Sequence, residues 1–466
     1  MSDIVKPERP GGFLDFLPAD CLARERMLRT IEKVFRSFGF DPIETPAIEF
    51  YKTLAGEGGD VGKQIFHVGC NKQEEDDALA LRFDQTVPFA RLLAANPFDP
   101  KKRTGIRLPW RRMVVGPVFR GERPQSGRYR QFCQFDADIA GTESMLADAE
   151  IIAMMYRTMK ALGIERFLIR INNRKILNGL GELVGISDGL ELSSVDITKE
   201  LMRILDKLDK IGLDRVLQEL GKEPCDRFDP APHLSSDGIN KIKEYLAISG
   251  NNSAKLDQCH KVFSGIKVAK EGLEELRQIT GYLAAMEIPE DHVQIDLSIA
   301  RGLDYYTGPV METILLDAPH IGSVFSGGRY NSLVSRFTGQ ELPAVGASIG
   351  VDRLFTALDH LKAIDRSRQT VTEVMILQLV PHREGDYLAM ANQLRDLGLN
   401  TEVCLLDDTT FKGQFNFAIS RGVNFVIICG SDEFEKQSVQ IKNLKTRIQT
   451  EVSRQGLAEY FGQSNR

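Results

Sequence analysis

The chain has 466 residues, more than one hydrophobic core usually holds, so two or three domains are expected. Its hydrophobic fraction of 42% and charged fraction of 27% exclude an intrinsically disordered chain, and its net charge of −6 excludes a nucleic-acid binder that is basic throughout. No apolar run approaches the roughly 18 residues of a membrane span, and residues 1–12 lack the apolar segment of a secretory signal. Seven scattered cysteines indicate reduced thiols, so a cytoplasmic location without membrane contact is expected.

The first part of the chain predicts a long helix followed by short strands. Apolar residues recur at helical spacing over 20–38, which indicates a helix. A strand is expected over 43–48, at a sheet edge or an interface because Pro46 interrupts it. Two further strands are expected over 79–84, where apolar and polar residues alternate, and over 113–120.

Basic residues are concentrated between positions 101 and 130. This segment holds ten Lys and Arg residues and one acid, Glu122, whereas 131–155 holds five acids and no base. Such a patch inside an acidic chain predicts a local site for a polyanion, such as phosphates, a nucleotide or an RNA end. The alternative is a solvated loop whose charges are paired.

A strand is predicted over 131–139, after a ten-residue loop at 121–130 that is long for a hairpin. One face of this strand is apolar, which predicts contact with a core; it carries Cys133, Phe135, Ala137 and Ile139. The opposite face is polar and begins with an aromatic ring; it carries Phe132, Gln134, Asp136 and Asp138. Solvent exposure is the usual meaning of such alternation. The lack of lysine on this face, next to a strongly basic segment, favours a binding surface instead.

The rest of the chain alternates between helical and mixed segments. Residues 180–290 predict a mainly helical insertion, and strands are expected over 293–297 and 310–316. A helix begins near Val351, and a polar linker follows it. The last part, 372–466, alternates apolar strands with helical stretches, which predicts a small α/β domain with a largely parallel sheet.

Phosphate-binding loops of the usual kinds are missing from the sequence, which has no Walker A segment and no Rossmann glycine motif after a strand. Nucleotide binding would then depend on arginines, which hold phosphate bidentately and stack on aromatic rings. The candidates are Arg120, Arg301 and Arg353. No metal site is expected, because the spacing of the cysteines and histidines matches no zinc pattern; the residues considered are Cys225, His233, Cys259 and His260.

Five segments together resemble the histidyl-tRNA synthetase family of class II aminoacyl-tRNA synthetases. Residues 116–132 resemble motif 2 of the class, 344–354 resemble motif 3, and 38–46 resemble motif 1, the dimerisation element. Two further segments, 301–307 and 326–330, resemble signatures of the histidyl-tRNA synthetases. The resemblance runs over nearly the whole chain.

The resemblance implies an α+β fold with a class II synthetase antiparallel sheet flanked by helices, a helical insertion and a C-terminal α/β anticodon-binding domain. The implied sheet is six-stranded. The catalytic domain is expected in two parts, with an insertion between them and a linker before the anticodon-binding domain. The boundaries, in chain order, are 1–176, 177–290 for the insertion, 291–362, 363–371 for the linker and 372–466.

The implied reaction has two steps. The carboxylate of L-histidine attacks the α-phosphate of ATP, which gives histidyl-adenylate and pyrophosphate, and the histidine then passes to the 3′ end of histidine tRNA. ATP and Mg²⁺ are the implied cofactors. The implied partners are L-histidine, ATP, a histidine tRNA contacted at its acceptor end and anticodon, and a second copy of the chain in a homodimer.

The resemblance also assigns roles to residues. The implied catalytic groups are fixed cations at the α-phosphate, Arg120 and Arg301. The implied ATP-binding residues are Arg120, Glu122, Phe132 and Arg353. The implied histidine-binding residues are Asp84, Gln85, Thr86, Gln134, Asp138, Arg301, Tyr305 and Tyr306. The implied tRNA acceptor-end loop carries Arg123, Gln125 and Arg128.

Two alternatives to this interpretation are open. Asp84 and Asp138 stand where one branch of the family has Glu, so each carboxylate is one methylene shorter. A non-charging, synthetase-like regulatory subunit of histidine biosynthesis is the first alternative, although such proteins generally lack the C-terminal domain and the intact 301–307 segment found here. A class II synthetase for another amino acid is the second.

Removal of the Arg301 side chain tests its implied role. Arg301→Ala is expected to abolish adenylate formation and leave the fold intact, because a fixed cation at the α-phosphate stabilises the charge that develops there. Exchange of pyrophosphate into ATP measures this step. A variant that keeps near-normal exchange would refute the role.

Overall fold

The computed structural model describes residues 5–55, 62–69, 78–125, 127–186, 193–223, 225, 229–299 and 305–464. The chain divides into two compact units. The larger comprises 27–363 with the first fourteen residues, and the smaller comprises 364–466 with 15–26. None of the helices in the described ranges is long and apolar enough to cross a membrane.

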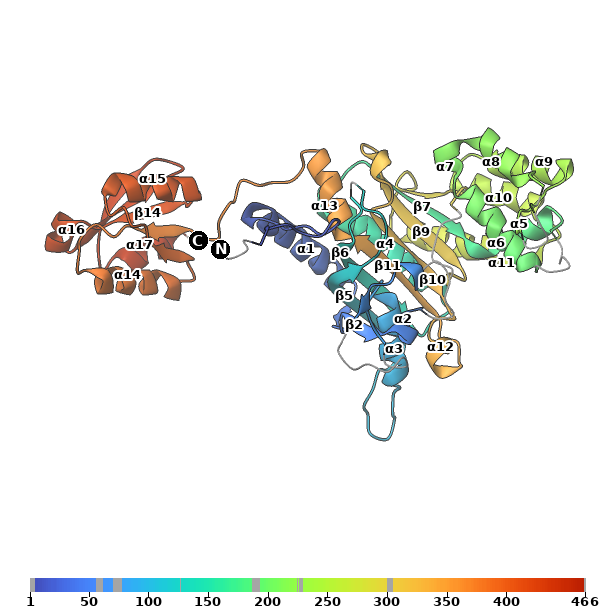
Figure 1. The fold of residues 1–466 in the computed structure, drawn as a ribbon, viewed down its shortest axis with the longest axis horizontal. Helices are drawn as coiled ribbons and strands as arrows, with labels where there is room; N and C mark the ends of the chain where they lie inside the picture. Colours follow the sequence, from blue (N-terminus) through green and yellow to red (C-terminus); the bar gives the residue numbers. More distant parts are fainter. Residues whose placement is uncertain are drawn as a thin grey trace. The chain divides into compact units, whose positions relative to one another are not determined.

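The larger unit is built on a mixed sheet to which eight strands of the described residues contribute, in the order β1-β5-β6-β11-β10-β9-β7-β8 (Figure 1). These strands are β1 (Asp41–Pro42), β5 (Trp110–Phe119), β6 (Gln131–Ala140), β7 (Phe167–Asn173), β8 (Val293–Ile295), β9 (Pro309–Leu315), β10 (Phe325–Tyr330) and β11 (Ala344–Gly350). The strands from β5 to β7 in this order pair antiparallel throughout, whereas β1 and β8 pair parallel at the two edges. The predicted α+β class is therefore confirmed, and the sheet has a parallel strand at each edge beyond the expected six.

Two predicted strands differ from those in the structure. The prediction of a strand over 43–48 is wrong, because β1 ends at Pro42 and the next strand, β2 (Ile48–Phe50), begins only at Ile48. The strand expected over 79–84 ends early, as β4 (Leu79–Leu81), in a small sheet of order β2-β4-β3 with β3 (His67–Val68). It ends there because Asp84 turns the chain into α3 (Thr86–Ala95), accepting hydrogen bonds from two backbone amides of that helix.

Helices cover the apolar face of the sheet. The helix expected over 20–38 is present as α1 (Pro18–Ser37), and the ring of its Phe35 meets that of Phe135 on β6 edge-on, with centroids 4.8 Å apart. Helix α4 (Met145–Ala161) packs along β6, β7, β9, β10 and β11. The apolar side chains of β6 therefore face a core, as the alternation predicted, and this leaves the opposite face of the sheet for other contacts.

The described residues of the insertion form helices joined by loops, and the insertion lies beside the β7–β8 edge of the sheet (Figure 1). Its helices are α5 (Arg174–Leu183), α6 (Ser194–Leu205), α7 (Leu208–Ile211), α8 (Leu213–Leu220), α9 (Ser236–Leu246), α10 (Asn252–Val262) and α11 (Lys267–Ala285). The remaining short elements of this unit are α2 (Tyr51–Ala55), η1 (Gly62–Gln64), η3 (Pro319–Ile321), α12 (Ser335–Thr338) and α13 (Val351–His360). Helix α11 packs on both α4 and α5 and so joins the insertion to the sheet.

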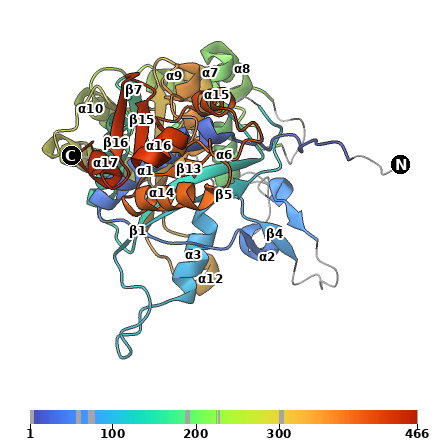
Figure 2. The same cartoon turned by 90° about the vertical axis from the view of Figure 1, so that its left-hand side faces the viewer.

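The smaller unit has its own sheet, in the order β13-β12-β14-β15-β16, between α14 and α15 (Figures 1 and 2). Its elements are β12 (Val374–Ile376), α14 (Glu384–Asp396), β13 (Thr401–Val403), α15 (Phe411–Arg421), β14 (Phe425–Ile428), α16 (Ser431–Lys436), β15 (Ser438–Asn443), β16 (Gln449–Ser453) and α17 (Leu457–Ser464). Side chains of β12 alternate between a core with α14 and α17 and a core with α15.

The expectation of a largely parallel sheet in this unit is wrong. The pairs that β12 makes with β13 and β14 are parallel, but β14 with β15 and β15 with β16 are antiparallel. The hairpin of β15 and β16 was missed because β16 exposes every second residue and lacks the continuous apolar run of the central strands.

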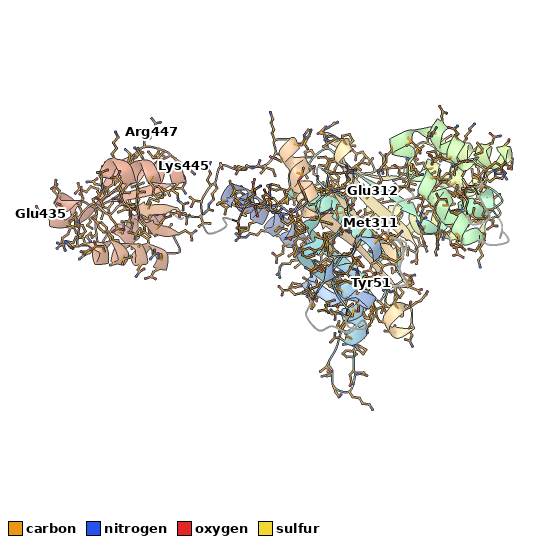
Figure 3. The ribbon with its side chains drawn as sticks, viewed as in Figure 1. Tyr51, Met311, Glu312, Glu435, Lys445 and Arg447 are labelled. Carbon is orange, nitrogen blue, oxygen red and sulfur yellow. The ribbon has the colours of Figure 1, made fainter. Side chains whose placement is uncertain are left out.

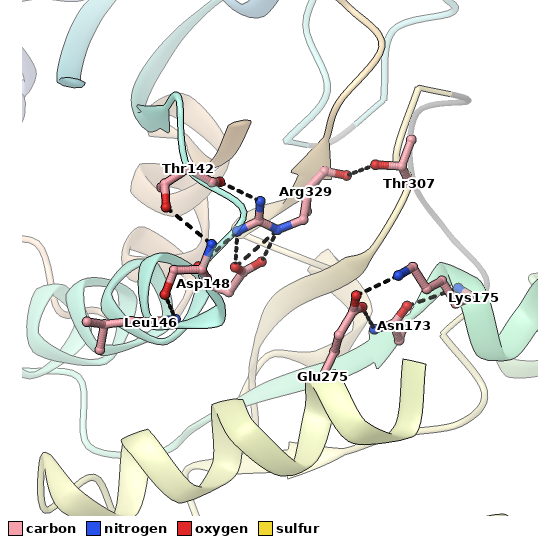
Figure 4. A network of polar contacts seen from close by, with 9 residues as sticks. Thr142, Leu146, Asp148, Asn173, Lys175, Glu275, Thr307 and Arg329 are labelled. Atoms are coloured by element: carbon pink, nitrogen blue, oxygen red, sulfur yellow. Dashed lines mark hydrogen bonds and ion pairs between the residues drawn. The ribbon is translucent and has the colours of Figure 1, made fainter. Parts of the chain in front are cut away.

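A buried ion pair ties β10 to the start of α4 (Figure 4). The guanidinium of Arg329 donates to both carboxylate oxygens of Asp148 and to the backbone carbonyls of Thr142 and Ser144. Both charged side chains are buried. The backbone carbonyl of Arg329 also accepts the amide of Thr307 at 2.8 Å. Arg329 therefore joins β10 to the segment before α4 through its side chain and to Thr307 through its backbone.

Breaking this pair from one side is expected to be costly. Arg329→Met leaves the Asp148 carboxylate buried without its cation, so the free energy of unfolding should fall by about 3–5 kcal/mol. The double variant Arg329→Met/Asp148→Ala removes both charges and should lose less. Denaturant unfolding of both variants measures this. A double variant less stable than Arg329→Met would contradict the expectation.

Candidate functional site

A cavity of about 320 Å³ lies on the open face of the central sheet. Strands β6, β9, β10 and β11 contribute its floor, and the loop between β5 and β6 contributes to its wall. The cavity brings together most of the residues that the sequence singled out: Asp84, Thr86, Arg120, Glu122, Arg128, Phe132, Gln134, Asp138, Tyr305, Tyr306 and Arg353. Arg301 lies outside the described residues.

The polar face of β6 is buried in this cavity. Gln134, Asp136 and Asp138 expose only 8%, 2% and 3% of their surfaces, so the alternative of plain solvent exposure is excluded. Buried polar groups without partners are costly, and this face retains several. Its unpartnered acceptors are Gln134 Oε1, Asp136 Oδ1 and Asp138 Oδ2.

Asp138 is held by two residues that the sequence did not single out. Its Oδ1 accepts the Tyr330 hydroxyl at 2.6 Å, and its Oδ2 lies 2.6 Å from Arg112 Nη2 in an ion pair that lacks hydrogen-bond alignment. Burial raises the pKa of this carboxyl, while Arg112 and Tyr330 oppose the rise. Gly346 faces Asp138 across the ladder, and a Cβ added there would lie 1.9 Å from Oδ1.

Gln134 and Asp136 meet at a serine of the neighbouring strand. The amide nitrogen of Gln134 donates to Ser348 Oγ at 2.8 Å, and Ser348 lies opposite Asp136 in the β6–β11 ladder. The pKa of Asp136 is raised to about 7, mainly by burial; Arg112 and Ser348 oppose the rise, and Asp138 adds to it. Sequence reasoning placed Asp136 on the correct face but gave it no role, and it missed Ser348.

The turn before α3 contributes a second wall. Oδ1 of Asp84 accepts the amides of Thr86 and Val87 at 3.1 and 3.0 Å, and burial raises the pKa of this carboxyl. Thr86 lines the cavity. Gln85 does not line it: its side-chain nitrogen lies 3.3 Å from the carbonyl oxygen of Gly116 on β5. Its implied place among the histidine-binding residues is thus not supported by the geometry, because adjacent residues point to opposite sides of the turn.

Three tyrosines stack edge-on at one end of the cavity. Tyr305 lies 5.1 Å from Tyr306 and 5.7 Å from Tyr330 between ring centroids. Burial raises the pKa of all three hydroxyls, so they are neutral donors at physiological pH. A Cβ on Gly328 would lie 2.8 Å from the Tyr306 ring, so a glycine at that position leaves room for it. Met311 and Glu312 of β9 also line the cavity (Figure 3).

Arg120 follows β5 and lies between two aromatic rings. Its guanidinium carbon is 4.4 Å from the ring centre of Phe83 and 5.1 Å from that of Phe132, and its Nε donates to the Phe83 carbonyl at 3.2 Å. Burial lowers the pKa of Arg120, and the nearby Asp84 and Glu122 oppose this. The side chain is therefore a fixed cation that lines the cavity.

Arg353 provides a second cation that lines the cavity. It lies in the first turn of α13, and its guanidinium donates to the carbonyls of Ser323 at 2.9 Å and Gly127 at 3.4 Å. Burial lowers its pKa. The preceding residue, Asp352, accepts the amide of Cys133 on β6 at 2.6 Å. This contact holds α13 to the strand beside Phe132.

The basic segment is not one patch. Arg111 pairs with Glu150, Arg112 is buried against Asp138, and Lys102 lies 3.7 Å from Asp99. Its cavity-lining cations are Arg120 and Arg128, and Arg128 lies 4.0 Å from Glu122. Nearby acids thus neutralise part of the positive charge of this segment, which agrees with the alternative of paired charges. Two residues of the loop, Arg123 and Gln125, are exposed and do not line the cavity.

Comparisons with known proteins agree with the geometry. The profile of the histidyl-tRNA synthetase family matches residues 12–354, and that of an anticodon binding domain matches 373–463. The chain is 39% identical to a histidine–tRNA ligase of Clostridium tetani over 97% of each chain. It resembles the crystal structure of histidyl-tRNA synthetase from Nostoc sp. PCC 7120 with a TM-score of 0.81 and 32% identity, over 99% of this chain and 100% of that one. An ATP phosphoribosyltransferase regulatory subunit/histidyl-tRNA synthetase from Bacillus halodurans has a TM-score of 0.70 at 22% identity, over 89% and 97% of the two chains, which shows the fold alone.

The close approach of Gly346 to Asp138 predicts a sensitive position. Gly346→Ala should lower the free energy of unfolding by at least about 1–3 kcal/mol, because the added methyl displaces a carboxylate that is already buried and bonded. Gly281→Ala, in α11 with open space around its Cβ, is the matched control and should not destabilise. Thermal unfolding compares them. Equal stability of both variants would contradict the packing described for Asp138.

Proposed function

The chain belongs to the histidyl-tRNA synthetase family, and we propose that its cavity binds L-histidine and ATP side by side, forms histidyl-adenylate, and presents it to the 3′ end of histidine tRNA. The observation that carries this proposal is the pairing of a buried acidic floor with a cationic end in one cavity. An ammonium and an imidazole need acceptors, whereas phosphates need fixed cations.

The cationic end fits ATP. Arg353 and the ring of Phe132 both line the cavity there, and a guanidinium and an aromatic ring are suited to hold the two faces of adenine. Glu122 lies next to this end and would accept the adenine amino group. The two roles follow the family resemblance, and the contacts of Arg353 with Ser323 and Gly127 support them by fixing its plane.

The acidic end fits histidine. Asp138 Oδ2 is ion-paired to Arg112 but accepts no hydrogen bond, so it can accept the ring N–H, and Tyr305 and Tyr306 would close around the imidazole. Gln134, Thr86 and Asp84 line the adjoining part of the cavity, where the α-amino group would lie. A ligand without ring nitrogens would forgo the hydrogen bond to Asp138 Oδ2, so apolar analogues should bind less well.

The first chemical step needs positive charge where the two ends meet. A carboxylate oxygen of histidine attacks the α-phosphorus of ATP, the bond to the β-phosphate oxygen breaks, and pyrophosphate leaves. Arg120 would neutralise the charge that develops on the α-phosphate, since its contact with the Phe83 carbonyl and two rings holds it in place without reorganisation. Arg301 is proposed as the second such cation on the resemblance alone.

Mg²⁺ would add charge at the phosphates, where it usually takes one or two protein carboxylates and several waters. Glu122 and Glu312 are the glutamates that line the cavity among the described residues, and each faces a guanidinium, Arg128 or Arg170. In the described ranges, no group of three or more His, Cys, Asp and Glu side chains could hold a metal ion. These residues therefore do not fit a protein-held ion, and Mg²⁺ stays a prediction for the ATP complex.

The transfer step depends on a second unit. The anticodon-binding profile over 373–463 supports tRNA recognition and disfavours the non-charging regulatory alternative. The exposed loop residues Arg123, Gln125 and Arg128 are proposed to meet the acceptor end. The homodimer and the cytoplasmic location stay predictions.

Exchange of pyrophosphate into ATP, run with each of the twenty amino acids, tests the function. Histidine alone should support exchange. Arg120→Ala should lower that exchange by about 100- to 1,000-fold, because one fixed donor to the developing charge is lost. Arg123→Ala, in the same loop but outside the cavity, is the control: it should keep exchange and lower the rate of tRNA charging.

Three outcomes would contradict the proposal. Exchange supported by an amino acid other than histidine would show that the cavity is not specific for histidine. A folded chain that binds histidine without exchange would favour the regulatory alternative. Unchanged exchange by Arg120→Ala would show that Arg120 does not stabilise the charge that develops on the α-phosphate.

A further inference from the structure

We propose that Asp136 and Gln134 form a clamp for the α-ammonium group of histidine, and that Ser348 sets the direction of the Gln134 side chain. This inference rests on the proposed function and deepens it. The resemblance assigned no role to either Asp136 or Ser348.

The clamp begins with the position of Ser348. Its hydroxyl oxygen accepts an amide N–H of Gln134 at 2.8 Å, and Ser348 lies directly opposite Asp136 in the β6–β11 ladder. One of the two N–H donors of the Gln134 NH₂ group is thereby occupied, and Oε1 is an acceptor without a partner. Both Gln134 Oε1 and Asp136 Oδ1 are buried without a partner in side chains that line the cavity.

The number of unpartnered acceptors fits an ammonium. Gln134 and Asp136 are two residues apart on one face of β6, so their side chains are neighbours. An ammonium offers three N–H donors, whereas a neutral imidazole offers one, and Asp138 further along the strand already has an acceptor for that one. Two adjacent acceptors beside a third therefore match the amino group and the ring of one histidine molecule.

Charges of both signs surround Asp136, and one of its oxygens has no hydrogen-bond partner among them. Asp138 and Asp84 lie near it as like charges, and the opposing cations are Arg112, Arg82 and Arg120. Arg112 is ion-paired to Asp138, and Arg82 donates to the carbonyls of Pro117 and Thr45. In the described part of the cavity, Asp136 keeps an oxygen that none of these groups contacts, and a bound ammonium would contact it.

Asp136→Asn tests the clamp, because it removes the charge and keeps the volume. The KM for histidine in pyrophosphate exchange should rise at least about tenfold, and the KM for ATP should not change. Calorimetric titration of the same variant should show a similar loss for histidine and for histidinol, which keeps the amino group. The deamino analogue imidazolepropionate should bind both proteins equally.

Ser348→Ala tests the positioning role. It should weaken histidine and histidinol binding by about three- to tenfold without affecting imidazolepropionate, because the Gln134 amide is no longer oriented. Ser348→Thr retains the hydroxyl and should restore binding. A purely structural role would instead weaken all three ligands and ATP together, and thermal unfolding reports any loss of fold.

The outcomes separate this inference from the proposed function. If the unaltered chain does not bind histidine, the proposed function fails. If it binds histidine and Asp136→Asn binds it equally well, the clamp alone is overturned. Equal losses for histidine and imidazolepropionate would also overturn the clamp, because Asp136 would then act on the ring.

Discussion

The burial of a polar strand face is the constraint on which this structure depends. On this face of β6, the amide of Gln134 and the carboxylates of Asp136 and Asp138 are buried. Each oxygen without a partner there has a large desolvation cost. Side chains of the neighbouring strands offset part of this cost by pairing with these groups. Arg112 approaches from β5, Tyr330 from β10 and Ser348 from β11. The acceptors that remain unpaired are those that a polar ligand would satisfy.

The same constraint explains the glycines of two signature segments. Gly346 lies opposite Asp138, so only a residue without a side chain leaves the carboxylate its place. Gly327 and Gly328 allow close contact with β11 and with the Tyr306 ring, respectively. The buried pair of Arg329 and Asp148 then holds this stretch of β10 from behind (Figure 4). These glycines thus give room to the Asp138 carboxylate, to the β11 backbone and to the Tyr306 ring.

The sequence predicted much of this arrangement, and its failures have physical causes. Alternation in β6 predicted both faces correctly, because a strand with a period of two separates a core face from a polar one. Arg112 was counted within a basic patch, and its burial against Asp138 follows from strand register, which composition does not contain. Ser348 was missed because it is 214 residues from its partner Gln134. Gln85 was grouped with its neighbours by resemblance, whereas the turn at α3 directs its side chain toward β5, and its role in histidine binding stays a prediction.

A crystal structure of the chain with bound L-histidine tests the central claim most directly. The account predicts that the α-nitrogen lies within hydrogen-bond distance of Gln134 Oε1 and Asp136 Oδ1, and that the imidazole ring lies against Asp138. It would be contradicted by a histidine whose ring lies beside Phe132, or whose α-nitrogen makes no contact with β6.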